Sequence, residues 1–136
     1  MTRQGSINIG LLIIRLGLGT MFILAHGLPK LLGGPERWKA VGKAMSTLGI
    51  HFAPTLWGFA AAMAEFGGGI LLILGLFTRF ASAAMAFTML VATLQYLPGG
   101  ATLLKVSHPI EVGVTLLGLV FLGAGAYSLD RRLGKA

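Results

Sequence analysis

The sequence predicts an all-α protein: an integral membrane four-helix bundle formed by residues 1–136 as a single domain. Hydrophobic residues make up 55% of the chain and charged residues only 11%, which is not the composition of a soluble domain. The charges lie between long apolar segments, as expected when those segments are buried in lipid. A short amphipathic interfacial helix is expected between helices one and two.

The first predicted span runs from Ile7 to Leu28. Its length of about 22 residues is enough to cross about 30 Å of hydrocarbon. Arg15 interrupts the apolar run and no A-x-A cleavage site follows, so a retained helix is favoured over a signal peptide. Pro29 is expected to end this span because proline interrupts helical hydrogen bonding.

The interfacial helix is predicted over Glu36 to Leu48, where apolar side chains recur at helical spacing. It is suited both to lying in the membrane interface and to packing over the bundle. The other spans are predicted over Thr55 to Phe77, Ala81 to Leu97 and Pro109 to Leu129. Only a tight turn separates the second span from the third, so these two helices are expected to be antiparallel neighbours.

The charge pattern indicates lipid as a partner. The net charge of +7 comes from basic residues that flank the spans, where anionic headgroups lie, and this argues against nucleic acid. Four spans place both termini on one side, but the basic residues outside the spans divide evenly between the two sides and do not decide the orientation. The chain has no cysteine, which excludes thiolate-ligated iron–sulfur clusters and c-type haem attachment.

Glu65, inside the second span, is the polar residue around which the prediction is built. A charge at the bilayer centre costs roughly 2.5 to 3.5 kcal/mol, so this carboxylate needs a partner. From the predicted helix ends, Arg15 lies about 20 Å deep and Glu65 about 15 Å deep, within reach of an arginine side chain. We therefore predict an ion pair between Arg15 and Glu65, serving either as a structural clamp or as part of a working site.

Further polar residues gather near the boundary opposite the termini. Phe22 and His26 share one helix face with Arg15. Gln95, His108 and Glu111 lie near the same boundary, which suggests a vestibule above the buried pair. Ordinary roles also fit these residues: Glu111 can cap a helix that starts at Pro109, and His26 and Gln95 can lie among the headgroups.

No metal site is predicted. The chain has one reversed Glu-x-x-His pair, where a di-iron bundle uses two such motifs. Two histidines at one boundary could also ligate a haem, but the sequence has no motif for it.

Three blocks of the chain resemble the DoxX family of small four-helix membrane proteins, over nearly the whole length. They are RLGLGTMFILAHGLPKL (15–31), LGIHFAPTLWGFAAAMAEFGGGILLILGLFTRFAS (48–82) and GAGAYSLDR (123–131). The resemblance implies a multi-pass protein of a prokaryotic inner or plasma membrane, with cytoplasmic termini and oxidoreductase subunits as partners. It also implies a site at Arg15, His26, Lys30 and Glu65, with Arg79 in the turn after the second helix.

These observations combine into a hypothesis of quinone binding. A quinone is apolar with two carbonyl acceptors, so its site needs apolar walls, a hydrogen-bond donor and a titratable group. We expect His26 to donate, Glu65 to relay a proton and Arg15 to keep Glu65 ionised. The remaining substrate-binding residues are predicted to be Lys30, Phe22, Trp57, Gln95, His108 and Glu111, with Phe66, Met63 and Met89 as further apolar walls.

The expected function is therefore a membrane subunit of a quinone-linked redox system, with no covalently bound cofactor and a quinone as ligand. Whether the chain is itself an enzyme stays open, because electrons must come from a separate subunit or a diffusible reductant. Two alternatives remain. The protein can be a non-catalytic scaffold that anchors soluble oxidoreductases or associates with its own copies, or it can form a pathway for a small solute or proton. The pathway requires a second opening toward the terminal side.

Overall fold

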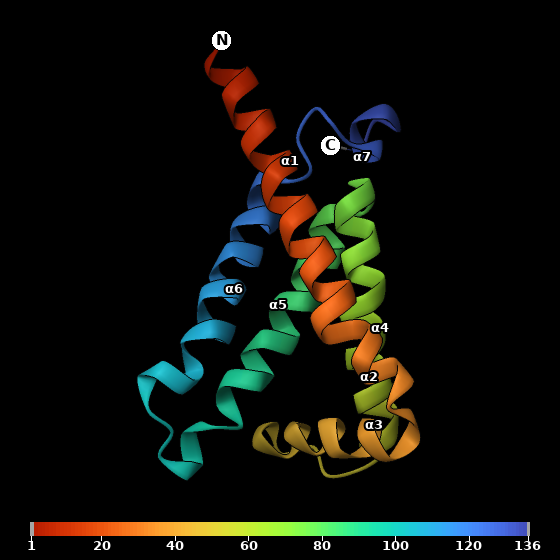
Figure 1. Cartoon of the computed structure of the whole chain (residues 1–136), viewed down its shortest axis with the longest axis vertical. Coiled ribbons are helices and arrows are strands. Elements are labelled where there is room, and N and C mark those ends of the chain that lie inside the picture. The colour runs from red at the N-terminus through yellow and green to blue at the C-terminus, as the bar shows by residue number, and fades with distance from the viewer. Residues whose placement is uncertain (1, 136) are drawn as a thin grey trace.

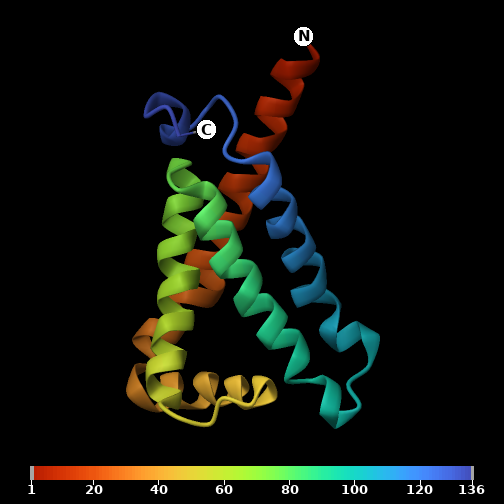
Figure 2. The same cartoon turned by 180° about the vertical axis from the view of Figure 1, so that it is seen from behind.

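The computed structural model describes residues 2–135, which fold as helices joined by short connections. Within them, four segments are long and apolar enough to cross a membrane: Arg3–Leu32, Pro54–Leu74, Thr78–Gly99 and Leu103–Leu122. This confirms the predicted all-α class with four membrane-spanning helices. Both ends of the chain lie at the same end of the bundle (Figures 1 and 2).

The first span is longer than predicted. Helix α1 (Arg3–Met21) continues through a π-helical turn, η1 (Phe22–Gly27), into α2 (Leu28–Leu32), and the whole segment has 30 residues. In η1 the Leu28 N–H donates to the Ile23 carbonyl five residues back. Pro29 then falls in the first turn of α2, where its missing N–H is least costly. The expectation that Pro29 ends the span is therefore wrong.

Helix α3 (Gly34–Gly42) and the 3₁₀ helix η2 (Lys43–Leu48) lie crosswise at the end of the bundle opposite the termini (Figure 1). Helix α3 packs against α4 with almost no space between the two backbones. A Cβ added to Gly42 would lie 1.7 Å from the Pro54 oxygen, and one added to Gly58 would lie 1.6 Å from the Trp38 oxygen. Only glycine permits this approach, which holds α3 against the start of α4.

Helices α4 (Pro54–Leu74) and α5 (Thr78–Leu94) form an antiparallel pair, and the short η3 (Leu97–Gly99) leads to α6 (Leu103–Leu122). Helix α6 begins before Pro109 and ends before the predicted Leu129. His108 and Glu111 therefore lie inside the helix, and the predicted capping role of Glu111 at the helix start is wrong. Gly123, with a φ of 74°, turns the chain out of the helix at its other end.

The helices enclose a core in the half of the bundle nearer the termini and in its middle. The buried apolar side chains in contact there are Leu11, Phe22, Leu72, Met85, Ala86, Met89, Leu116 and Leu119. Helices α1 and α4 approach closely at Gly19 and Gly69, where a Cβ on Gly19 would lie 2.7 Å from the Gly69 oxygen. This contact sets the register of the two helices that carry the predicted ion pair.

Arg15 ties the end of α4 to the segment that follows α6. Its side chain is 1% exposed. The Nε atom donates to the Leu72 carbonyl at 2.9 Å, Nη1 donates to the Tyr127 carbonyl at 2.9 Å and also to the Ala124 carbonyl, and Nη2 donates to the Ile73 carbonyl at 3.3 Å. The carbonyls of Ile73, Ala124 and Tyr127 lie at or beyond helix ends, where intrahelical donors run out, so the guanidinium takes the place of the missing N–H groups. The Leu72 carbonyl also accepts from the Gly75 N–H at 3.1 Å.

Asp130, at the start of the short α7 (Leu129–Arg132), closes the same end of the bundle. Its carboxylate accepts from the backbone N–H groups of Phe77 and Thr78 at 2.8 and 2.9 Å. An acidic group at the N-terminus of α5 is favoured by both hydrogen bonding and the helix dipole. The C-terminal segment is thus fastened to the bundle by Arg15 and Asp130 together.

Candidate functional site

A cavity of about 710 Å³ lies toward the end of the bundle opposite the termini, between α2, α3, α4, α5 and α6. Its walls are mainly apolar and include small side chains from α4 and larger ones from α5. The polar and charged residues that line it are His26, Lys30, Arg37, Glu65, Thr88, Gln95, Tyr96, Lys105 and His108. The volume is within the range of about 300–1,000 Å³ that is usual for small-molecule sites.

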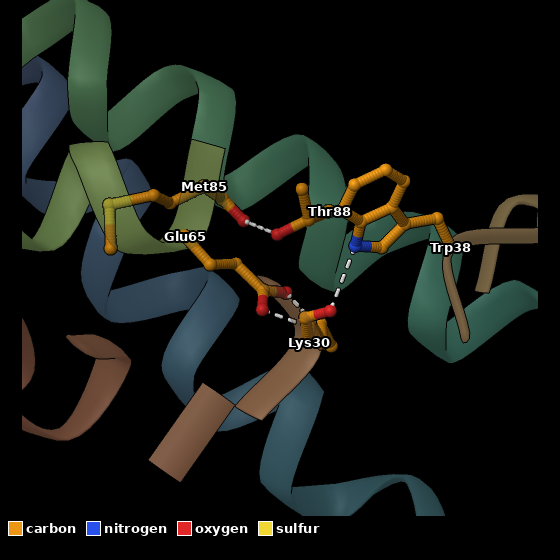
Figure 3. Close-up of polar contacts among 5 residues, drawn as sticks. All are labelled: Lys30, Trp38, Glu65, Met85 and Thr88. Atoms are coloured by element: carbon orange, nitrogen blue, oxygen red, sulfur yellow. Dashed lines mark hydrogen bonds and ion pairs between the residues drawn. The ribbon is translucent and has the colours of Figure 1, made fainter. Parts of the chain in front are cut away.

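An ion pair between Lys30 and Glu65 lies in the wall of this cavity (Figure 3). The Lys30 Nζ atom donates to both carboxylate oxygens of Glu65, at 2.7 Å to Oε1 and 2.5 Å to Oε2. The Glu65 side chain is 1% exposed and that of Lys30 is 21% exposed. The carboxylate is therefore buried, while the ammonium reaches it from the more open side.

The extension of the first span brings Lys30 to this position. Because α2 ends at Leu32, the Lys30 carbonyl is one of the last in the helix and lacks an intrahelical donor. The Trp38 indole N–H on α3 donates to it at 2.9 Å, as Figure 3 shows. The Trp38 ring also meets the Phe59 ring on α4 edge to face, with centroids 4.9 Å apart. Helix α3 thus positions the residue that pairs with Glu65.

The predicted ion pair between Arg15 and Glu65 is wrong, because the register of the first two spans differs from the expected one. A Cβ added to Gly27 would lie 2.5 Å from the Phe66 nitrogen, so Gly27 is level with the residue after Glu65. Arg15 is about 18 Å further along the first helix at helical rise. It lies beside the opposite end of α4, where the Leu72 carbonyl accepts from it.

His26 and His108 face each other across the cavity wall, from η1 and α6. Their rings are stacked with centroids 5.7 Å apart and an interplanar angle of 22°. Phe22, in the core, also contacts His26, with a centroid distance of 5.5 Å and an interplanar angle of 45°. Within residues 2–135, neither imidazole has a hydrogen-bond partner. Both rings therefore have ring nitrogens available to a ligand.

The cavity brings together most of the predicted site residues. His26, Lys30, Trp57, Glu65, Gln95 and His108 all line it. Three residues of the predicted set do not. Arg15 belongs to the clamp at the other end, Phe22 lies in the core beneath His26, and Glu111 is exposed on α6, where its carbonyl accepts from the Thr115 hydroxyl.

The expected apolar walls are likewise only partly in place. Met89 and Trp57 line the cavity, whereas Met63 is exposed on the outer face of α4 and Phe66 packs against Gly27. Helix α4 has one face turned toward the cavity and one turned outward. Because Glu65 lies on the inward face, Met63, two residues away, falls on the outward face.

Sequence reasoning missed four polar residues of the cavity wall, Arg37, Thr88, Tyr96 and Lys105. Arg37 and Lys105 are among the basic residues that flank the spans, and their charge alone predicts contact with lipid headgroups. Sequence reasoning also missed the hydrogen bond from Trp38 to Lys30, although Trp38 is one of the apolar side chains at helical spacing between Glu36 and Leu48. The sequence did contain a signal for this bond. The indole N–H of Trp38 needs an acceptor, and the helix just before it ends with carbonyls that lack intrahelical donors.

Comparison with known proteins finds relatives of this chain. The DoxX family model matches residues 10–97, a range that contains His26, Lys30 and Glu65. The chain is also similar to the Inner membrane protein YqjF of Escherichia coli (strain K12), with 30% identity over 131 residues that cover 94% of this chain and 95% of that protein. No solved structure matches the chain.

Proposed function

The chain belongs to the DoxX family, and on that basis we propose that this membrane protein is the quinone-binding subunit of a redox system in a prokaryotic inner membrane. One observation carries the proposal. Two imidazoles without protein hydrogen-bond partners, His26 and His108, stand beside the Lys30–Glu65 ion pair in a cavity with mainly apolar walls. Apolar walls with a few convergent polar groups are typical of sites for small organic ligands.

The shape and chemistry of a quinone match this wall. Its flat ring is apolar and would pack against the small and apolar side chains of α4 and α5, while its carbonyl oxygens need donors. His26 is the first candidate donor, because its ring is half-buried and in contact with the rings of Phe22 and His108. Two oriented donors near one wall would fix the position of the ring.

Reduction of a quinone to the quinol consumes two electrons and two protons. The residues of this chain would supply or relay the protons: the Lys30 ammonium shares its protons with Glu65, and His26 lies in the same wall. A buried acid–base pair next to a donor histidine is suited to passing protons at a fixed position. The electrons would come from an oxidoreductase subunit that docks on the membrane protein or from a diffusible reductant.

The family resemblance further suggests an orientation, which we adopt as part of the proposal. The termini would face the cytoplasm, and the cavity end would then face the periplasm or cell exterior. A quinone would reach the cavity from the lipid phase near that surface.

The proposal is tested by equilibrium binding of naphthoquinone to the purified protein in nanodiscs of neutral lipid. We expect saturable binding by the native chain, weakened at least tenfold in His26→Ala and in Glu65→Gln. Glu111→Gln is the matched control, because it removes a carboxylate from α6 outside the cavity wall. Each variant must first show native helix content and an unchanged elution profile.

Failure of the folded native protein to bind naphthoquinone would overturn the proposal and favour the scaffold alternative, in which the ion pair is purely structural. The pathway alternative has less support. A second, smaller cavity of about 300 Å³ lies near the termini between Asn8, Arg79 and residues 122–126. The buried core around Leu72, Met85 and Leu116 lies between the two cavities.

A further inference from the structure

We propose that the cavity selects quinones that carry an acidic ring hydroxyl group and binds them as anions. The inference rests on the proposed function, since it specifies the ligand class of the same site. It follows from the balance of charge and of hydrogen-bonding groups in the cavity wall rather than from its apolar surface.

The charged residues in the wall do not cancel. Lys30 and Glu65 neutralise each other, and within residues 2–135 theirs is the sole ion pair. Arg37 on α3 and Lys105 on α6 also line the cavity, and neither has a carboxylate within ion-pair distance. The wall therefore carries two uncompensated positive charges, contributed by two different elements.

Both of these cationic side chains are in contact with neighbouring residues. The aliphatic stem of Arg37 packs against Gly33, where an added Cβ would lie 2.4 Å from the Arg37 Cδ atom. The Lys105 ammonium lies over the Tyr96 ring, 5.1 Å from its centroid. Both stems are thus supported by neighbours that also lie at this end of the bundle, which keeps their charges near the cavity.

Hydrogen-bonding capacity is unbalanced in the same direction. The wall offers purely donating groups from Lys105 and Arg37, whereas the two imidazoles, Gln95 and Tyr96 can each both donate and accept. Its one carboxylate, Glu65, already accepts from Lys30 through both oxygens. A ligand that brings acceptors and a negative charge would satisfy the two cationic donors, for which the wall has no free carboxylate.

A quinone with an ionised ring hydroxyl has this character. It keeps the flat apolar body and adds one negative charge spread over its oxygens. In a partly exposed site, two cations several ångströms away would favour the anion over a neutral ring of the same shape by about tenfold, which corresponds to about 1.4 kcal/mol. Salt would reduce this preference, because the two cations are exposed to solvent on one side.

The test compares lawsone, a naphthoquinone with an acidic ring hydroxyl, with unsubstituted naphthoquinone. Binding of both is measured to the full-length protein in phosphatidylcholine nanodiscs at neutral pH, with empty nanodiscs as the blank. One double variant, Arg37→Gln with Lys105→Gln, removes both cavity cations. The matched control, Lys39→Gln with Lys43→Gln, removes two basic residues of the same interface that do not line the cavity.

We expect lawsone to bind the native protein about tenfold more tightly than naphthoquinone. The cavity variant should reduce that ratio to about two or less, because it weakens the binding of lawsone more than that of naphthoquinone, and the control variant should leave the ratio unchanged. Equal affinities for the two ligands, or a ratio that survives in the cavity variant, would overturn the inference and leave the proposed quinone site intact. Absence of binding by either ligand would overturn both.

A second arm examines the other source of anions in a membrane. If the native protein binds lawsone no more tightly than naphthoquinone once phosphatidylglycerol is present at low mole fraction, a lipid headgroup occupies the two cations in an anionic membrane and the inference is wrong. If the protein still prefers lawsone to naphthoquinone in the presence of phosphatidylglycerol, anionic hydroxyquinones remain the ligand class of the cavity.

Discussion

The ammonium of Lys30 lies between the two carboxylate oxygens of Glu65, 2.5 and 2.7 Å from them, and joins the end of the first membrane span to the second helix. The pair also lies in the wall of the cavity, so the same contact is structural and accessible to a ligand. Removing one partner from a buried pair leaves a charge without compensation, which costs more than removing both.

Replacing Lys30 with Met should therefore be more damaging than replacing both partners. We expect Lys30→Met to lower the free energy of unfolding by about 3–5 kcal/mol, and Lys30→Met with Glu65→Gln to recover part of this loss. Reversible unfolding in mixed micelles measures the difference, with Lys39→Met, on the exposed face of α3, as the control. A double variant no more stable than Lys30→Met would contradict the cost of leaving the buried Glu65 carboxylate without its counter-ion.

The crossing of α3 over α4 should tolerate no added methyl group. Gly58→Ala would place its Cβ against the Trp38 carbonyl, and backbone cannot move aside as a flexible side chain can. We expect a loss of about 2 kcal/mol or more in unfolding free energy, together with displacement of α3. Gly67→Ala, on the same helix but with open space around the position, is the matched control and should be neutral or slightly stabilising. Equal effects of the two substitutions would contradict the tight crossing.

Arg15 should act on the stability of the terminal end and leave the ligand cavity unaffected. Arg15→Met leaves the carbonyls of Ala124 and Tyr127 without their donor and removes one of the two donors to Leu72, and we expect it to lower the unfolding free energy by about 3 kcal/mol or more. The C-terminal segment should then be cut faster by trypsin after Arg131 or Arg132. Naphthoquinone affinity of the folded fraction should be unchanged, and a selective loss of that affinity would instead place Arg15 in the site.

The four spans could be predicted because apolar composition over a membrane-length segment leaves few alternatives. The register of the helices relative to one another could not be predicted in this way. Pro29 is a helix breaker in most contexts, and only the π-helical turn before it allows the first span to reach Lys30. That extension moves Arg15 away from Glu65 and brings Lys30 to it. Glu65 was therefore predicted correctly as a carboxylate in need of a counter-ion, but its partner depended on a local backbone feature with no sequence signature.

The positions of His26 and Gln95 at one boundary followed from helix lengths alone, and both line the cavity. Glu111 was misplaced for a physical reason. Pro109 was assigned to a helix start, its most favourable location, whereas α6 begins at Leu103, more than a turn and a half earlier, and tolerates the proline inside. The face of a helix that turns inward depends on where the helix begins and what it packs against, and Glu111 consequently points outward.

Orientation in the membrane can be tested with single cysteines, because the chain has none of its own. Arg3→Cys and Arg132→Cys place a thiol at the terminal end, and Lys39→Cys places one on α3 at the cavity end; all three positions are exposed. With cytoplasmic termini, a membrane-impermeant maleimide added to spheroplasts should label Lys39→Cys at once. The two terminal variants should be labelled only after the membrane is permeabilised. The reverse pattern would place the cavity on the cytoplasmic side, where a quinone would meet soluble reductants directly.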